Sequence, residues 1–162
     1  MTNEWLDRLR AILKAYDERS ANPPAVAKSA QKEAIRQRRA AGDRLRNVVR
    51  PVLQGILAEL KSAGHEASVQ DHTDSDDAYP SVGLTFTPMA HGLSQGALAS
   101  VLAFRYDPRR GIVVQRDIRA SARGRTMSTG FDRGGTIGVD AVTAEWVETK
   151  TLSFVDGVLK AN

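Results

Sequence analysis

A serine in the middle of the chain has the surroundings of a hydrolase nucleophile. Gly92 and Gly96 flank Ser94 at the spacing of a nucleophile elbow, a sharp turn between strand and helix that exposes the serine. In that class of enzyme the catalytic histidine follows the serine, whereas all three histidines of this chain precede it. We therefore interpret residues 92–96 as a loop between strands and predict no catalytic residue.

A glycine-rich segment at residues 130–136 has the glycine spacing of a phosphate-binding loop. In such a loop, backbone N–H groups converge on the anion and a lysine follows the last glycine. Here Thr136 follows Gly135, and no apolar strand precedes the segment. The sequence therefore indicates a linker and no nucleotide cofactor.

The loop of residues 71–77 contains four aspartates and His72, which are the ligand types that hard cations prefer. Aligned with a calcium-binding loop, it has no glycine at the sixth position, and Val82 stands where the bidentate glutamate belongs. Clustered carboxylates without a cation repel one another and stay in water. We predict a solvated acidic loop and no metal site.

Basic residues recur along one face of a predicted helix at steps of three, four and seven. They are Lys28, Lys32, Arg36, Arg39, Arg46 and Arg50. Eight basic and two acidic side chains lie within residues 28–50. Such a basic face can follow a phosphate backbone through counterion release, without reading any base. The alternatives are an acidic protein partner and a plain solvated helix face.

An amphipathic helix is predicted over residues 3–19, because apolar residues recur there every three or four positions. Trp5, Leu9 and Ile12 lie on its apolar face. An exposed helix of this kind can insert its apolar face into a partner's groove. These three residues are the predicted docking residues, and packing within the protein or its dimer is the alternative.

A second helix is predicted from residue 23 to residue 62 or 63, with Gly64 as its left-handed C-cap. We expect Gly42 to be a flexible point and Pro51 to kink the helix. An apolar stripe continues in phase through the proline: Leu45, Val48, Val49, Val52, Leu53, Ile56, Leu57 and Leu60. Residues 25–44 offer little to bury, so this stretch requires a partner, either the first helix in a hairpin or another subunit.

The remainder of the chain predicts strands and a last helix. Alternating or apolar segments indicate strands at residues 67–71, 81–87, 98–106, 111–119 and 125–128, and a helix is expected from an Asp140 N-cap to the C-terminus. In residues 98–106 we expect Leu98, Leu102, Phe104 and Tyr106 to face the core. Hairpin-length connections favour an antiparallel sheet.

The predicted fold is α+β. It comprises an N-terminal helical hairpin or long kinked helix, an antiparallel sheet of three to five strands with helices packed on one face, and a C-terminal helix. We predict a helical arm over residues 1–44, for dimerisation or partner docking, and an α+β sandwich domain over residues 45–162.

Composition excludes several classes of protein. The 162 residues include no cysteine, which rules out disulfides, cysteine-bound metals and thiol nucleophiles. No apolar run reaches the roughly 18 residues of a membrane span, and the first residues mix charges where a signal peptide is apolar. We expect a cytoplasmic protein with no membrane partner and a net charge of +4.

These patterns favour a non-enzymatic binding or assembly module that forms a homodimer through its N-terminal helices and binds another protein. The first alternative is a nucleic-acid-binding accessory protein that uses the basic helix of residues 28–50. The second is a small metal-dependent or hydrolytic enzyme centred on His72, His91 and the acidic loop.

Overall fold

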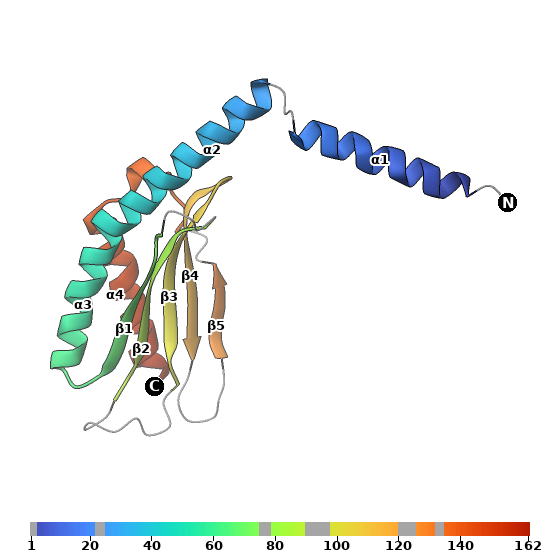
Figure 1. Cartoon of the computed structure of the whole chain (residues 1–162). Coiled ribbons are helices and arrows are strands. Elements are labelled where there is room, and N and C mark those ends of the chain that lie inside the picture. Colours follow the sequence, from blue (N-terminus) through green and yellow to red (C-terminus); the bar gives the residue numbers. More distant parts are fainter. Residues whose placement is uncertain (1–2, 22–24, 75–78, 90–97, 120–125, 132–134) are drawn as a thin grey trace. The chain divides into compact units, whose positions relative to one another are not determined.

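The computed structural model describes residues 3–21, 25–74, 79–89, 98–119, 126–131 and 135–162. The chain forms two compact units, Met1–Arg36 and Gln37–Asn162. The elements in chain order (Figure 1) are α1 Glu4–Ala21, α2 Ala25–Arg44, the π-helical segment η1 Leu45–Val49, α3 Arg50–Ser62, β1 Glu66–His72, β2 Ser81–Thr87, β3 Ser100–Asp107, β4 Gly111–Arg119, β5 Thr126–Phe131, the short 3-10 helix η2 Val139–Ala141 and α4 Ala144–Ala161. This is the predicted α+β class.

The five strands form one antiparallel sheet in the order of the sequence, β1 to β5. The predicted boundaries of β2 and β4 are confirmed at both ends, and the other three strands lie within a few residues of their predicted positions. At the predicted turn between β3 and β4, the Asp107 carboxylate accepts a hydrogen bond from the Arg109 N–H at 2.8 Å, and Gly111 has a φ of +101°. The strand positions and the antiparallel pairing follow the predicted pattern of alternating residues and turn residues, and the structure adds the order of the strands.

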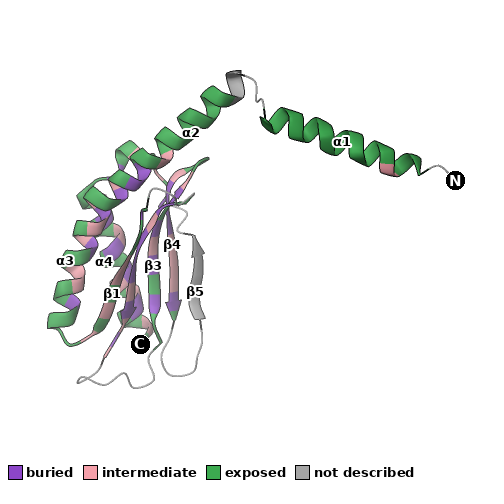
Figure 2. Cartoon of the chain, viewed as in Figure 1, coloured by how far each residue is buried: buried purple, intermediate pink, exposed green. Residues whose placement is uncertain are grey.

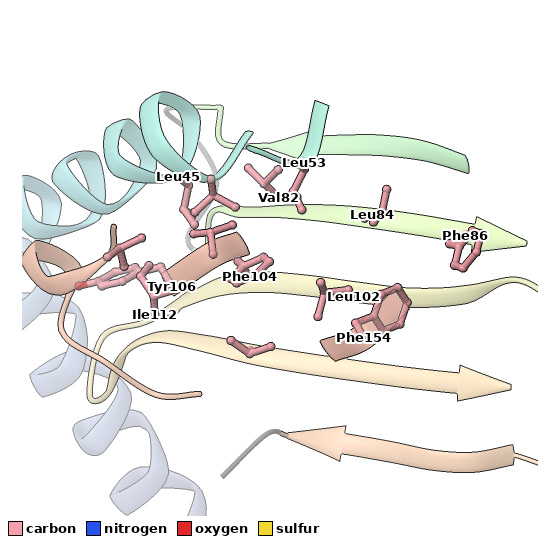
Figure 3. Close-up of a cluster of buried hydrophobic side chains, with 14 of the residues drawn as sticks. Leu45, Leu53, Val82, Leu84, Phe86, Leu102, Phe104, Tyr106, Ile112 and Phe154 are labelled. Atoms are coloured by element: carbon pink, nitrogen blue, oxygen red, sulfur yellow. The ribbon is translucent and has the colours of Figure 1, made fainter. Parts of the chain in front are cut away.

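The core lies between one face of the sheet and the helices α3 and α4. Alternate strand residues point into it, and Figure 3 shows side chains from β2, β3 and β4 meeting Leu53 of α3 and Phe154 of α4. Phe104 and Tyr106 are buried as predicted, and the Trp146 ring meets Phe104 edge-on at 5.7 Å. Leu98 is an exception to the prediction: it precedes β3 and is exposed, because the strand begins only at Ser100.

The predicted disturbance at Pro51 takes the form of a π-helical turn. Over Leu45–Val49 the helix widens, and the Arg50 N–H donates to the Leu45 carbonyl, five residues back. Proline lacks the N–H of a regular helix, and its ring collides with the carbonyl four residues earlier. A wider turn just before the ring relieves that collision, and the apolar stripe stays buried or half-buried on both sides of it.

The two glycines that were expected to shape this helix have different roles. Gly64 has a φ of +90° and ends α3 as predicted, with the His65 N–H donating to the Leu60 carbonyl. Gly42 is not a flexible point, because α2 continues through it and the residue is buried. A Cβ there would lie 3.6 Å from the Thr73 carbonyl oxygen and 3.8 Å from Pro80, which are ordinary van der Waals distances.

The N-cap of the last helix differs from the prediction. Asp140 lies in η2, and α4 begins after Thr143, whose hydroxyl accepts a hydrogen bond from the Trp146 N–H at 3.2 Å. Threonine also suits an N-cap, although it ranks below aspartate, and here the Val139–Ala141 turn places Asp140 before the start of the helix.

Membrane spanning was tested helix by helix. Among the described residues, none of the helices has the length and apolar character required to cross a bilayer.

Candidate functional site

The apolar side chains of α1 are exposed to solvent. None of the described residues of this helix is buried, and Trp5, Ile12 and Tyr16 are 66%, 63% and 61% exposed (Figure 2). Leu9 and Leu13 are exposed as well. At 3.6 residues per turn these side chains lie on one side of the helix, and we call this side the α1 face. The three predicted docking residues, Trp5, Leu9 and Ile12, all belong to it.

The borders of the α1 face are mainly basic. Helical spacing places Arg8 and Arg19 along one border and Asp17 along the other. Arg10 lies further round the helix and pairs with the Asp7 carboxylate at 3.7 Å, and the acidic residues Glu4 and Glu18 also fall away from the face. A partner for this face therefore has to cover apolar side chains and meet two arginines along one border, with one carboxylate along the other.

A second apolar surface lies between α3 and α4, which contact each other (Figure 1). The surface is a groove of about 480 Å³, which we call the α3–α4 groove; its lining residues are Pro51, Val52, Gly55, Ile56, Glu59, Glu148 and Leu152. Leu152 is 61% exposed, and Leu159, two helical turns further along α4, is exposed too. The sequence analysis missed this groove, because the pairing of α3 with α4 cannot be read from either helix alone.

The predicted basic stripe is divided by the fold. Lys28, Lys32 and Arg36 belong to the first compact unit, and Arg39, Arg46 and Arg50 belong to the second. Lys28 and Lys32 are exposed, whereas Arg36 forms a two-point contact with Glu33 whose shorter distance is 2.7 Å. That contact raises the pKa of the Arg36 guanidinium through a hydrogen bond and through charge attraction.

Arg46 of η1 and Arg50 of α3 form hydrogen bonds and an ion pair with residues at the end of β1. The Arg46 guanidinium donates to the hydroxyl and the carbonyl oxygen of Thr73 at 3.2 and 3.0 Å, and Arg50 pairs with the Asp71 carboxylate at 3.0 Å. Asp71 in turn accepts hydrogen bonds from the backbone N–H and the hydroxyl of Thr73. These two arginines therefore have structural partners within the chain, which leaves fewer free charges for a phosphate backbone.

The same contacts determine the charge of Asp71. Partial burial by itself raises the pKa of this carboxyl group, but the two hydrogen bonds from Thr73 and the charges of Arg50 and Arg46 outweigh it and hold the pKa below its ordinary value. A carboxyl group with a lowered pKa in the folded state stabilises the fold at pH values above its unfolded pKa, about 3.9. That contribution disappears as the pH falls through the folded pKa.

This linkage predicts a pH-dependent effect of replacing Asp71. The Asp71→Asn variant keeps an oxygen that can accept from Thr73 but loses the charge, so it should be less stable than the wild type at about pH 7. The difference should be smaller at about pH 2.5, because it declines below the unfolded pKa of about 3.9 and is lost as the pH falls through the lower folded pKa. Urea unfolding of both proteins at the two pH values measures this, and a difference that is independent of pH contradicts the assigned role.

Arg39 lines a pocket of about 170 Å³ at the end of the sheet. The lining also includes Arg38, Gly42, Asp43, Arg46, Thr73, Asp74 and Pro80. Basic and acidic side chains share this lining, and Arg46 already donates to Thr73 there. The pocket therefore has no strong preference for an anion or for a cation.

Arg44 is a basic residue whose role the sequence analysis missed. Its guanidinium donates twice to the Val142 carbonyl oxygen, at 3.0 and 2.6 Å, and so joins the end of α2 to the segment before α4. Nearly one hundred residues separate the partners, and no local pattern signals the contact. Arg44 lies in the compact unit that begins at Gln37.

The residues considered for catalysis and metal binding are not brought together in the described part of the chain. The His65 Nδ1 accepts a hydrogen bond from the Met89 N–H at 2.9 Å, and its ring meets Phe86 edge-on, which is a packing role. His72 is exposed at the end of β1. His91, Ser94, two aspartates of the acidic loop and part of the glycine-rich segment lie outside the described residues. Among the residues described, no three potential metal ligands form a cluster.

Comparison of the chain with protein-family models, with curated proteins and with solved structures finds no match. The functional interpretation therefore rests on surfaces of the chain itself, above all the α1 face and the α3–α4 groove.

Proposed function

We propose that this protein is a non-enzymatic binding and assembly module that forms a homodimer through its N-terminal helices. The observation that carries the proposal is the exposure of the α1 face, with Trp5, Ile12 and Tyr16 each more than half exposed. An isolated helix of about 18 residues gains little stability from its own backbone in water, and most of the stability of protein helices comes from burial of an apolar face. A partner that covers the α1 face supplies that burial.

Burial of the α1 face by a partner would contribute free energy to association. Fully burying one large apolar side chain contributes about 1.5 to 3 kcal/mol, and five exposed apolar side chains lie on this face. In a symmetric dimer each copy contributes its own helix, so every contact occurs twice. Because these side chains are 43% to 66% exposed, roughly half of that burial is available to a partner, and it opposes an entropic cost of association of about 4 to 15 kcal/mol.

The Ile12→Asp variant should be monomeric at concentrations where the wild type is a dimer. Loss of the Ile12 contact in both copies removes about 3 kcal/mol or more, which corresponds to a dissociation constant at least about a hundredfold higher. Ile12 is 63% exposed, so the substitution removes little packing within the chain itself. Sedimentation equilibrium of the full-length protein measures the change.

Ala11→Asp is the matched control, because it adds the same side chain one residue away, on the side of α1 opposite its apolar residues. This control should dimerise like the wild type. A wild type that is monomeric at high concentration, or equal effects of the two substitutions, would refute the proposed role of the α1 face.

A further inference from the structure

We propose that the α1 face of each copy docks into the α3–α4 groove of a second copy, so that the dimer exchanges its N-terminal helices reciprocally. This inference rests on the proposed function and specifies the surface that receives α1. The two surfaces are both apolar, their borders carry opposite charges, and the groove contains a glycine that leaves room for another helix.

The groove offers an apolar surface to an incoming helix. Val52 and Ile56 of α3 and Leu152 of α4 line it, and Leu152 is 61% exposed. Gly55 lies between the two α3 residues in sequence, and a Cβ added there would meet no atom within 4 Å. A glycine in an exposed helix interior is unfavourable for that helix, but without a side chain it allows the backbone of another helix to approach closely.

The charges at the borders of the two surfaces are complementary. Glu59 of α3 and Glu148 of α4 line the groove, and none of the described lining residues is basic. Both carboxylates belong to exposed residues, and neither has an ion-pair partner within the part of the chain that the structure describes. The α1 face has Arg8 and Arg19 along one border. Opposite charges at the edge of a contact guide association and select the partner.

The same charges disfavour a dimer in which α1 pairs with a second α1. Each α1 face has two arginines along one border and one aspartate along the other, so pairing two of these faces brings four arginines and two aspartates to one interface. Like charges placed opposite each other across an interface oppose association. The acidic groove therefore suits α1 better than another copy of α1 does.

Gly55→Arg tests the groove directly in the full-length protein. The open space around the Gly55 Cβ accepts the new side chain without displacing a neighbour, and arginine is the better helix former. The side chain covers the groove and places a positive charge near Glu59, four residues along the helix. Sedimentation equilibrium should show a dissociation constant at least tenfold above that of the wild type. Gln54→Arg, which adds the same side chain at an exposed neighbouring position outside the groove, should dimerise normally.

A mixing experiment tests whether α1 of one copy docks into the α3–α4 groove of the other copy. Ile12→Asp disrupts the α1 face and leaves the α3–α4 groove intact. Gly55→Arg blocks the groove and leaves the α1 face intact. Each variant alone has no intact contact and should self-associate less than the wild type, whereas an equimolar mixture should form a heterodimer through the one intact contact, with an affinity below that of the wild type. Circular dichroism of each variant verifies that both remain folded.

The outcomes separate this inference from the proposed function. A dimer that is disrupted by Ile12→Asp but unaffected by Gly55→Arg supports assembly through α1 and refutes docking in the groove. Failure of the mixture to associate also refutes helix exchange. A monomeric wild type overturns both proposals.

Discussion

The Leu53→Ala variant should unfold with a free energy about 2 to 5 kcal/mol lower than that of the wild type. Leu53 is fully buried, and Figure 3 shows its side chain beside Val82 of the sheet. Removal of three carbons there forfeits their transfer free energy and leaves a cavity that the surrounding side chains fill only in part. Urea unfolding followed by circular dichroism measures the loss.

Gln54→Ala is the control for this prediction, because Gln54 is the next residue of α3 and is exposed. Its effect should stay within about 0.5 kcal/mol, as for most surface substitutions. A loss below about 0.5 kcal/mol for Leu53→Ala would mean that α3 does not pack on the sheet through this residue.

Gly111→Ala should destabilise the protein by about 3 kcal/mol or more, through two effects that add. The backbone φ of +101° is unfavourable for any residue with a Cβ, at a cost of roughly 1 to 2 kcal/mol. The added Cβ would also lie 2.3 Å from the Ile137 carbonyl oxygen, which is part of the backbone and cannot turn aside. Relief of that clash disturbs the paired hydrogen bonds between Ile112 and Ile137, at 2.8 and 3.2 Å, each contributing about 1 kcal/mol.

Two other glycines separate these effects. Gly64 has a similar φ of +90° but nothing within 4 Å of an added Cβ, so Gly64→Ala should show the backbone cost alone. Gly138 has an ordinary φ of −62° and also lies in open space, so Gly138→Ala should change stability by less than about 0.5 kcal/mol. Equal losses for the substitutions at Gly64 and Gly111 would contradict the steric argument for Ile137.

Local patterns predicted most of the secondary structure. The period of the apolar residues predicted α1 and the buried stripe of η1 and α3, and alternation with a proline-containing turn predicted β2, β3 and β4. These signals depend on the geometry of one helix or one strand. The prediction of Asp140 as the N-cap was wrong, because residues 139–141 form a 3-10 turn and Thr143 caps α4 instead.

The roles of two residues in the basic stripe could not be predicted from the sequence. Helical spacing put Arg46 and Arg50 on one face with Lys28 and Lys32, which was sufficient to suggest a common ligand. It did not indicate that Thr73 and Asp71, more than 20 residues away, would accept hydrogen bonds from these two arginines. A partner supplied by another element changes the role of a charged side chain without changing any local pattern.

The sequence by itself determined the α+β class, the positions of most strands and the apolar face of α1, because each follows from periodicities within one segment. Only the tertiary structure decided which glycines permit close contacts, which arginines hold the fold together and where an acidic apolar groove forms. Each of these depends on contacts between elements that are distant in the chain, and such contacts exist only after α3, α4 and the sheet have packed together.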